Sequence, residues 1–234
     1  MAVDDSYTKS LLHFDGVDAS TTFTDESGKT WTHYGDAQID TAQSVFGGAS
    51  GLLDGAGDYI TTPDHDDFYL ADGNWTFDFR LRYSDKDSAA YPTVASQYDD
   101  ADNYFYIRRN RDLNKFNCSG AVGGVSIFSF YCNWIPANDT WYHIEVSRNG
   151  DTPLIFINGV SQSITQVTPV AGKNMGNLAG VFTIGRFGTS NNIAGWIDEF
   201  RFSNGICRHT ADFTSPTSAY PLPISEILTP MWFM

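Results

Sequence analysis

One carboxylate in this sequence could serve either as a metal ligand or as a hydrogen-bond acceptor. Asp198 lies in the stretch 195–202, Gly-Trp-Ile-Asp-Glu-Phe-Arg-Phe, whose alternation predicts a β-strand. Phe200 and Phe202 share the face of Asp198, so we expect the carboxylate to point into the core, near the start of the strand. A buried carboxylate requires a cation, backbone N–H donors or contact with water at the edge of the domain. All three remain open for Asp198.

The sequence lacks the residue patterns of common catalytic sites. Its glutamates are Glu26, Glu145, Glu199 and Glu226, whereas retaining glycoside hydrolysis requires two carboxyl groups about 5 Å apart. Asp198 neighbours Glu199, but adjacent strand residues point to opposite sides. No nucleophile elbow, HExxH motif or phosphate-binding loop occurs, and the histidines are scattered without metal-ligand spacing. We therefore predict that the protein is not an enzyme.

Short strands must position any functional side chains. The clearest is 75–83, in which every odd position is apolar or aromatic and every even position is polar, the pattern of a half-buried strand. Residues 49–53 and 58–62 are expected to pair as a hairpin through a glycine-bearing turn. Further strands are predicted at 11–15, 37–39, 92–98, 103–108, 115–118, 125–131, 141–147, 154–157, 181–186 and 196–202. The fold class is therefore all-β, a two-sheet antiparallel jelly-roll sandwich.

Composition and charge exclude several classes of function. The chain of 234 residues carries a net charge of −14, so the basic footprint of a nucleic-acid-binding protein is absent. We find no apolar run long enough to cross a membrane and no secretion signal at the start of the chain. Cys118 and Cys132 flank a turn, and a tight hairpin there places Cys118 opposite a residue near Ser126, which argues against a disulfide. Free thiols and the missing signal indicate assembly in the cytoplasm.

Three segments resemble one family. The closing segment GWIDEFRFSNGICRHTADFTSPTSAYP, the earlier FGGASGLLDGAGDYITTPDHDDF and the central NDTWYHIEVSRNGDTPLIFINGV are similar to laminin-G-like, concanavalin A-type lectin/glucanase domains. The resemblance runs from about Leu11 to Tyr220 and implies a domain over 1–220, with a short helical turn near 206–212. It does not define the function, because this fold hosts lectins, glycosidases and structural modules.

The resemblance also implies a calcium site. Related domains commonly hold calcium at the edge of the sandwich, and the matching positions are the Asp198 carboxylate with carbonyl oxygens near Asp15 and Gly47–Gly48. Calcium takes six to eight oxygen ligands, which one carboxylate, carbonyls and waters can supply. The alternative is that Asp198 accepts only backbone N–H bonds. A single structural Ca²⁺ is the one cofactor that we expect.

The resemblance suggests, as a second kind of site, a saccharide platform. Sugar sites on this fold combine aromatic surfaces with polar and arginine partners. Tyr104 and Tyr106 share one face of their strand, Trp141 lies on the non-core side of another, and Arg80 and Arg82 project from the outer face of a third. We expect these five side chains to form a glycan-binding surface. The alternative is that they pack under loops or against a neighbouring subunit.

The last fourteen residues, 221–234, are apolar and punctuated by prolines. We predict an extended C-terminal arm that docks on another subunit. Its assembly interface would comprise Ile224, Ile227, Leu228, Met231, Trp232 and Phe233.

The opening segment LLHFDG and the closing segment RHTADFTSPTSAYP also resemble those of laminin-G-like proteins carried by tailed bacteriophages. That resemblance implies a non-enzymatic structural protein on the virion surface, assembled in the host cytoplasm as a homo-oligomer with other virion subunits. A capsid decoration (cement) role is the first expectation. The alternatives are a tail-associated lectin that recognises a host surface glycan and a carbohydrate-binding module of a cellular organism.

Overall fold

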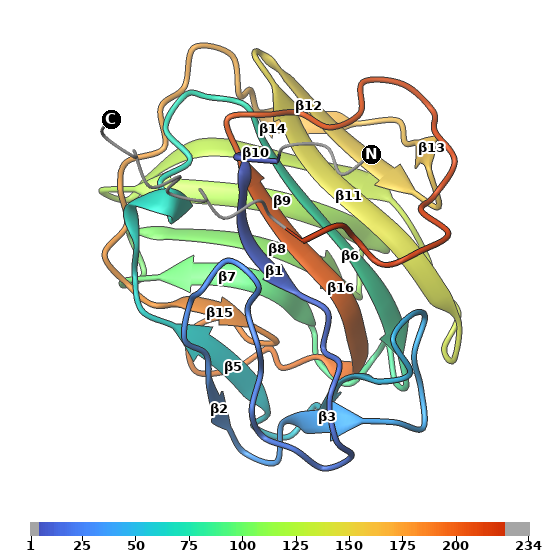
Figure 1. The fold of residues 1–234 in the computed structure, drawn as a ribbon. Coiled ribbons are helices and arrows are strands. Elements are labelled where there is room, and N and C mark those ends of the chain that lie inside the picture. The colour runs from blue at the N-terminus through green and yellow to red at the C-terminus, as the bar shows by residue number, and fades with distance from the viewer. Residues whose placement is uncertain (1–4, 223–234) are drawn as a thin grey trace, which may run out of the picture.

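A computed structural model describes residues 5–222 of the chain, and these residues form two antiparallel sheets packed face to face (Figure 1). The sheet that contains β1 is called the first sheet, and the sheet that contains β8 is called the second. The strands are β1 (Thr8–Leu12), β2 (Thr32–Tyr34), β3 (Gln38–Asp40), β4 (Ser50–Asp54), β5 (Tyr59–Thr62), β6 (Trp75–Tyr83), β7 (Thr93–Tyr98), β8 (Tyr104–Asn110), β9 (Lys115–Val122), β10 (Val125–Asn133), β11 (Trp141–Asn149), β12 (Thr152–Ile157), β13 (Val160–Ser161), β14 (Thr165–Thr168), β15 (Phe182–Ile184) and β16 (Ala194–Asn204). One 3₁₀ turn, η1 (Asp66–Phe68), joins β5 to β6.

The strand order confirms the predicted all-β sandwich. The first sheet runs β13-β12-β11-β6-β16-β4-β3, with β1 beside β16. The second sheet runs β14-β10-β9-β8-β7-β15-β5-β2. In Figure 1 the strands β1, β16, β6 and β11 lie in front of the green strands β7 to β10, so the two sheets form the two layers of one sandwich.

Aromatic side chains of β6 build the core between the layers. Phe77 is fully buried and contacts Phe202 of its own sheet, with ring centroids 4.4 Å apart. It also contacts Phe105 and Phe182 of the second sheet, at 5.3 and 6.0 Å. The structure confirms the predicted bounds of this strand and the inward direction of its odd positions, including Phe79. Burial of these large rings is the main stabilising contribution to the sandwich.

The prediction that Asp198 points into the core is wrong, because β16 contains a β-bulge. Asp198 pairs with Arg80 and Arg201 pairs with Asp78, so two residues of β16 oppose one residue of β6. Glu199, within the bulge, adopts the left-handed φ of 52°. The extra residue reverses the alternation, and Asp198 therefore lies on the outer face of the first sheet.

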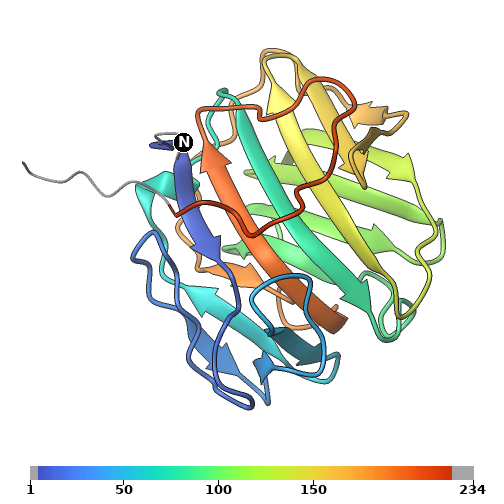
Figure 2. The same ribbon diagram turned by 45° about the vertical axis from the view of Figure 1, so that its right-hand side comes forward.

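The predicted helical turn near 206–212 is also wrong. Residues 206–220, which we call the strap, contain no helix in the structure as described. Figure 2 shows the strap crossing the outer side of β16, β6 and β11. Its backbone N–H groups bond to the sheet or its loops instead of to the strap itself: Arg208 donates to Thr76 Oγ1 at 3.1 Å and Phe213 donates to the Gly159 carbonyl at 2.9 Å. These partners replace the bonds within a helix.

The strap also explains why β6 is not half-buried. Its even positions face outward from the core, yet Thr76, Asp78 and Arg80 expose between 0 and 8 % of their surface. Each lies opposite an equally buried residue of β11, such as Glu145 opposite Asp78. Both faces of the strand are therefore covered.

The expected hairpin over 49–62 does not form, because its two strands belong to different sheets. β4 pairs with β16 and β3, whereas β5 pairs with β15 and β2. The Asp58 carboxylate accepts N–H bonds from Asp54 and Asp36 at 2.9 and 2.6 Å, which fixes the chain as it passes between layers. Sequence reasoning also missed β2, β13 and β14, which are short and largely polar.

The three cysteines are free, in agreement with the predicted absence of a disulfide. Cys118 lies opposite Phe130, not near Ser126, because the hairpin turns at Gly123–Gly124 and the register then shifts by one further residue. No helix among residues 5–222 is both long and apolar enough to cross a bilayer.

Substitution of the core residue Phe79 by alanine should lower the free energy of unfolding by about 3–5 kcal/mol, because it leaves a cavity between the sheets. Urea denaturation measures this loss. The control Val167→Ala, at a side chain that is 67 % exposed, should change stability by less than about 0.5 kcal/mol. Equal losses in the two variants would contradict the assignment of Phe79 to the core.

Candidate functional site

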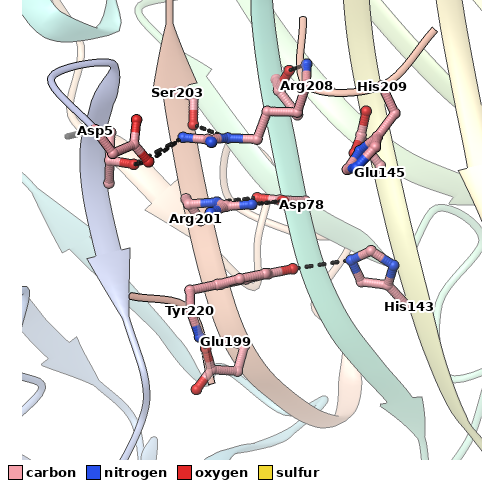
Figure 3. A network of polar contacts seen from close by, with 12 residues as sticks. Asp5, Asp78, His143, Glu145, Glu199, Arg201, Ser203, Arg208, His209 and Tyr220 are labelled. Carbon is pink, nitrogen blue, oxygen red and sulfur yellow. Dashed lines mark hydrogen bonds and ion pairs between the residues drawn. The ribbon is translucent and has the colours of Figure 1, made fainter. Parts of the chain in front are cut away.

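The outer face of the first sheet carries a buried ion pair beneath the strap (Figure 3). The Arg201 guanidinium of β16 donates to both oxygens of Asp78 on β6, with Nε–Oδ1 at 3.0 Å and Nη2–Oδ2 at 2.5 Å. Asp78 is 1 % exposed and Arg201 is 7 % exposed. This bidentate geometry is the strong form of a charge-assisted hydrogen bond. The Asp78 charge raises the pKa of Arg201 against the opposing effect of burial, so the guanidinium remains charged.

Further charged contacts fix the strap to this face. Arg208 donates to Asp5 at 2.6 Å, and His209 Nδ1 lies 2.6 Å from Glu145 Oε2. Tyr220, at the end of the strap, places its ring centroid 3.8 Å from the Arg201 guanidinium. Its hydroxyl lies 2.9 Å from His143 Nε2, and its N–H donates to the Glu199 carboxylate at 2.7 Å. The strap therefore occupies the outer face of the first sheet around the Arg201–Asp78 pair.

The protonation states of the covered groups follow from burial. Burial lowers the pKa of His143 to about 4, so its imidazole is neutral at physiological pH. Burial raises the pKa of Glu145, and its contact with His209 opposes that rise. A hollow of about 350 Å³ is lined by Arg201, Arg208, His209, Tyr220 and other strap residues. Its two arginines already have carboxylate partners.

The residues expected to hold calcium do come together. Asp198 Oδ2 accepts N–H bonds from Val45 and Phe46 at 2.7 and 3.2 Å. Two residues further on, Gly47 lies so close to Asp15 that an added Cβ would fall 1.7 Å from Asp15 Oδ1. Gly48 completes the same turn. The backbone of this loop therefore lies between the two carboxylates.

Half of the Asp198 carboxylate has no partner. Asp198 is 0 % exposed, and its Oδ1 accepts no hydrogen bond. Burial raises the pKa of Asp198 to about 7, and the negative charges of Glu199 and Asp15 add to that rise. A cation would offset all of these effects, so the residues present fit the expected ion. Among the described residues, no cluster of three or more His, Cys, Asp or Glu side chains has metal-binding geometry, so the other ligands would have to be carbonyl oxygens and water.

An aromatic cluster lies on the outer face of the second sheet. Tyr104 and Tyr106 of β8 stack, with ring centroids 5.6 Å apart and planes at 9°. Phe187, in the loop after β15, meets both rings edge-on at 5.5 and 5.2 Å. Arg108 lies over the Tyr106 ring at 3.7 Å and over the Tyr91 ring at 4.4 Å. Tyr106 is buried beneath these neighbours, whereas Tyr104, Phe187 and Arg108 remain partly exposed beside one another.

Polar side chains surround this cluster. The register places Ser119 and Ser96 on either side of Tyr106, and the same row continues to Thr183 and Thr61. A second row brings Asn117 beside Arg108. The hydroxyl row is buried, and Ser96 and Ser119 already donate to the Arg186 and Phe128 carbonyls. The Asn117 amide is partly exposed and its Oδ1 has no partner, so it can bind a polar ligand.

The predicted five-residue glycan surface is therefore wrong as a single site. Trp141 pairs with Arg82 on the outer face of the first sheet, and Arg80 lies on that face beneath the strap, where it donates to the Pro216 carbonyl. Tyr104 and Tyr106 lie on the outer face of the second sheet, on the opposite side of the sandwich. The sequence does not show which strands share a sheet, so it could not reveal that these five residues lie on two different sheets.

Sequence reasoning missed three members of the aromatic cluster. Arg108 was within reach, because its spacing from Tyr104 and Tyr106 puts all three on one face of β8. Tyr91 and Phe187 lie in loops, and they join the cluster only through contacts distant in sequence. No local pattern marks either residue.

Comparison with known protein families shows to which family this chain belongs. The model of the family Laminin_G_3, described as the concanavalin A-like lectin/glucanases superfamily, matches residues 54–209, which is about two thirds of the chain. The chain belongs to this superfamily. No functionally curated protein sequence matches it significantly.

Several solved structures share the fold of this protein although their sequence identity to it is low. Domain 4 of AbnA, an extracellular arabinanase of Geobacillus stearothermophilus solved in complex with arabinotriose, is 16 % identical with a TM-score of 0.65, and the match covers 86 % of this chain and 94 % of that one. The binding domains of Paraclostridial Mosquitocidal Protein 1 and of botulinum neurotoxin serotype G are each 14 % identical, with TM-scores of 0.64 and 0.63 over 86 % of this chain. The matches span only about half of the toxin chains, 50 % and 48 %.

Replacing Asp198 by asparagine should remove a specific dependence of stability on pH. Because the folded pKa of about 7 exceeds the reference value of 3.8, the folded state keeps a proton that the unfolded state has lost between these values. The unfolding free energy therefore falls as pH rises through this window. Asparagine is neutral throughout, so the difference in melting temperature between about pH 5 and about pH 8, measured in chelator, should be smaller in Asp198→Asn.

The same pair of proteins tests the calcium site. Millimolar Ca²⁺ at about pH 8 should raise the melting temperature of the wild type, because binding to the folded state alone adds stability, and should leave Asp198→Asn unchanged. A wild-type melting curve that is insensitive to both calcium and chelator would rule out the metal. That result would leave the pH dependence as a separate property of the buried carboxylate.

Proposed function

We propose that this protein binds saccharides through the outer face of the second sheet and does not cleave them. The observation that carries the proposal is the aromatic cluster on this face, in which Tyr104, Phe187 and Arg108 are partly exposed around the buried Tyr106. A sugar ring presents an apolar C–H face and a rim of hydroxyl groups. A flat aromatic surface bordered by hydrogen-bonding side chains is complementary to both.

The two faces of the sandwich differ in their ability to bind a ligand. The strap covers the part of the first sheet's outer face that contains Asp78, Glu145 and Arg201, and these residues already have partners within the protein. On the second sheet Tyr104 and Arg108 remain partly exposed. The second face is therefore the one that we assign to binding.

The structural neighbours support this proposal. One of them is an arabinanase domain solved with arabinotriose, and others are binding domains of toxins. A sandwich of this shape thus accommodates saccharide and receptor ligands in other proteins. Among the three roles expected from the sequence, a receptor-binding lectin or a carbohydrate-binding module is better supported than a capsid decoration.

The virion role stays a prediction. It depends on the C-terminal arm, whose interface residues Ile224, Ile227, Leu228, Met231, Trp232 and Phe233 lie outside the described residues. The proposed calcium ion, held by Asp198 and Asp15 beside Gly47, would be structural, because it lies at the first sheet and not at the aromatic cluster.

A glycan array followed by calorimetry tests the proposal. Tyr104→Ala should weaken binding of any array hit by about tenfold or more, because it removes one of the two stacked rings. Trp141→Ala is the matched control on the other sheet and should leave affinity unchanged. Loss of binding in Trp141→Ala with full binding in Tyr104→Ala would place the site on the first sheet and contradict its assignment to the second. The absence of any array hit would contradict the proposed function itself.

A further inference from the structure

We propose that the saccharide bound by this face is acidic, with a carboxylate on a uronic or sialic acid residue. This inference rests on the proposed function and adds the chemical class of the ligand. It follows from the distribution of charge over the second sheet, which differs from that of the chain as a whole.

The outward positions of the second sheet carry no acidic residue. The chain has twice as many acidic as basic residues, 28 against 14. Yet the cross-strand register assigns the following described residues to the outer face: Thr32, Tyr34, Tyr59, Thr61, Ser96, Tyr98, Tyr104, Tyr106, Arg108, Asn110, Lys115, Asn117, Ser119, Ala121, Ser129, Tyr131, Asn133 and Thr183. The only charged side chains among them are Arg108 and Lys115. A third cation, Arg186, joins the face from the loop after β15 and lies over the Tyr59 ring at 3.5 Å.

These cations are held by aromatic rings instead of by carboxylates. Elsewhere the described arginines Arg201, Arg208 and Arg109 form ion pairs. Arg108 and Lys115 form none with any described carboxylate; they lie over Tyr106 and Tyr131, at 3.7 and 3.8 Å from the ring centroids. The face therefore has positive charge with no internal counter-ion.

The Arg108 guanidinium is already oriented and partly dehydrated. Its plane is fixed between two rings, and its Nε is buried without a hydrogen-bond acceptor. Burial lowers the pKa of Arg108, and arginine side chains are charged in proteins at neutral pH. A fixed and poorly hydrated guanidinium is the group that best recognises a planar carboxylate, because it can donate two parallel hydrogen bonds.

The remaining groups of the face suit the rest of such a ligand. Asn117 lies between Arg108 and Tyr131 in the register, and its buried Oδ1 has no partner. The Lys115 ammonium lowers the pKa of the Tyr131 hydroxyl. The nearby carboxylates Asp99 and Asp100 lie in the loop before β8. Asp99 accepts backbone N–H bonds from Ala179 and Gly180, and Asp100 accepts one from Asp102.

The experiment compares acidic saccharides with neutral counterparts of the same shape. Tetragalacturonate is paired with its methyl ester, and 3′-sialyllactose is paired with lactose, so the two arms distinguish uronic from sialic acid. Affinities are measured by calorimetry on the full chain. We expect the acidic member of at least one pair to bind about tenfold or more tightly than its neutral counterpart.

Substitutions then locate the effect. Arg108→Gln should abolish the preference for the acidic member, and Lys115→Gln should reduce it. The control Lys9→Gln removes the same charge from β1 of the first sheet and should leave the preference intact. Arg108→Lys keeps the charge but loses the planar fork, so its preference should fall between those of the wild type and Arg108→Gln. Unchanged melting temperatures show that the variants remain folded.

The outcomes separate this inference from the proposed function. Equal binding of acidic and neutral members overturns the acidic ligand and leaves saccharide binding in place. A preference that survives in Arg108→Gln but disappears in Lys9→Gln also overturns the assignment to this face. If the protein binds neither the acidic nor the neutral saccharides and the array gives no hits, both the acidic ligand and saccharide binding itself are overturned.

Discussion

The buried ion pair between Arg201 and Asp78 sets the main constraint on this structure. Two charges on the outer face of a sheet are stable there only if each is fully hydrogen-bonded, because removing one partner leaves an uncompensated buried charge. The pair is bidentate, and Tyr220 covers it with its aromatic ring. The strap must therefore lie across this sheet for the pair to be shielded from water. Contacts of Arg208 with Asp5 and of His209 with Glu145 hold it in that place.

Closure of one face leaves the other face for function. The centre of the first sheet, around Asp78 and Arg201, is buried on both sides, and its polar groups are used to attach the strap. On the outer side of the second sheet the hydroxyl row is also buried, whereas Tyr104, Arg108 and Lys115 remain partly exposed, and these two cations have no carboxylate partner among the described residues. A chain with a net charge of −14 that keeps this surface free of acidic residues has the charge distribution of an anion-binding site. The superfamily and the structural neighbours show that the fold itself is compatible with binding functions.

The parts of the fold that depend on local alternation could be predicted from the sequence. The bounds of β6 and the inward direction of Phe77 and Phe79 follow from nine alternating residues. The direction of Asp198 could not be predicted, since a bulge at Glu199 shifts the alternation by one residue and leaves no clear mark in the sequence. The helical turn that the family resemblance implied near 206–212 does not form, because the backbone partners of this segment belong to other elements. The candidate site was predicted in part. Tyr104 and Tyr106 share one face of a strand, as their spacing indicates, but their separation from Trp141 depends on the order of strands in the sheets, which the spacing does not show.

Hydrogen–deuterium exchange with a saturating acidic oligosaccharide tests the central claim most directly, because it reports where the ligand acts without any substitution. The account predicts slower exchange in β8, in β9 and in the loop that carries Phe187, with no change in the strap or in β6 and β11. Slower exchange confined to the strap and the first sheet would contradict it, because the ligand would then bind the face that the protein covers with its own chain.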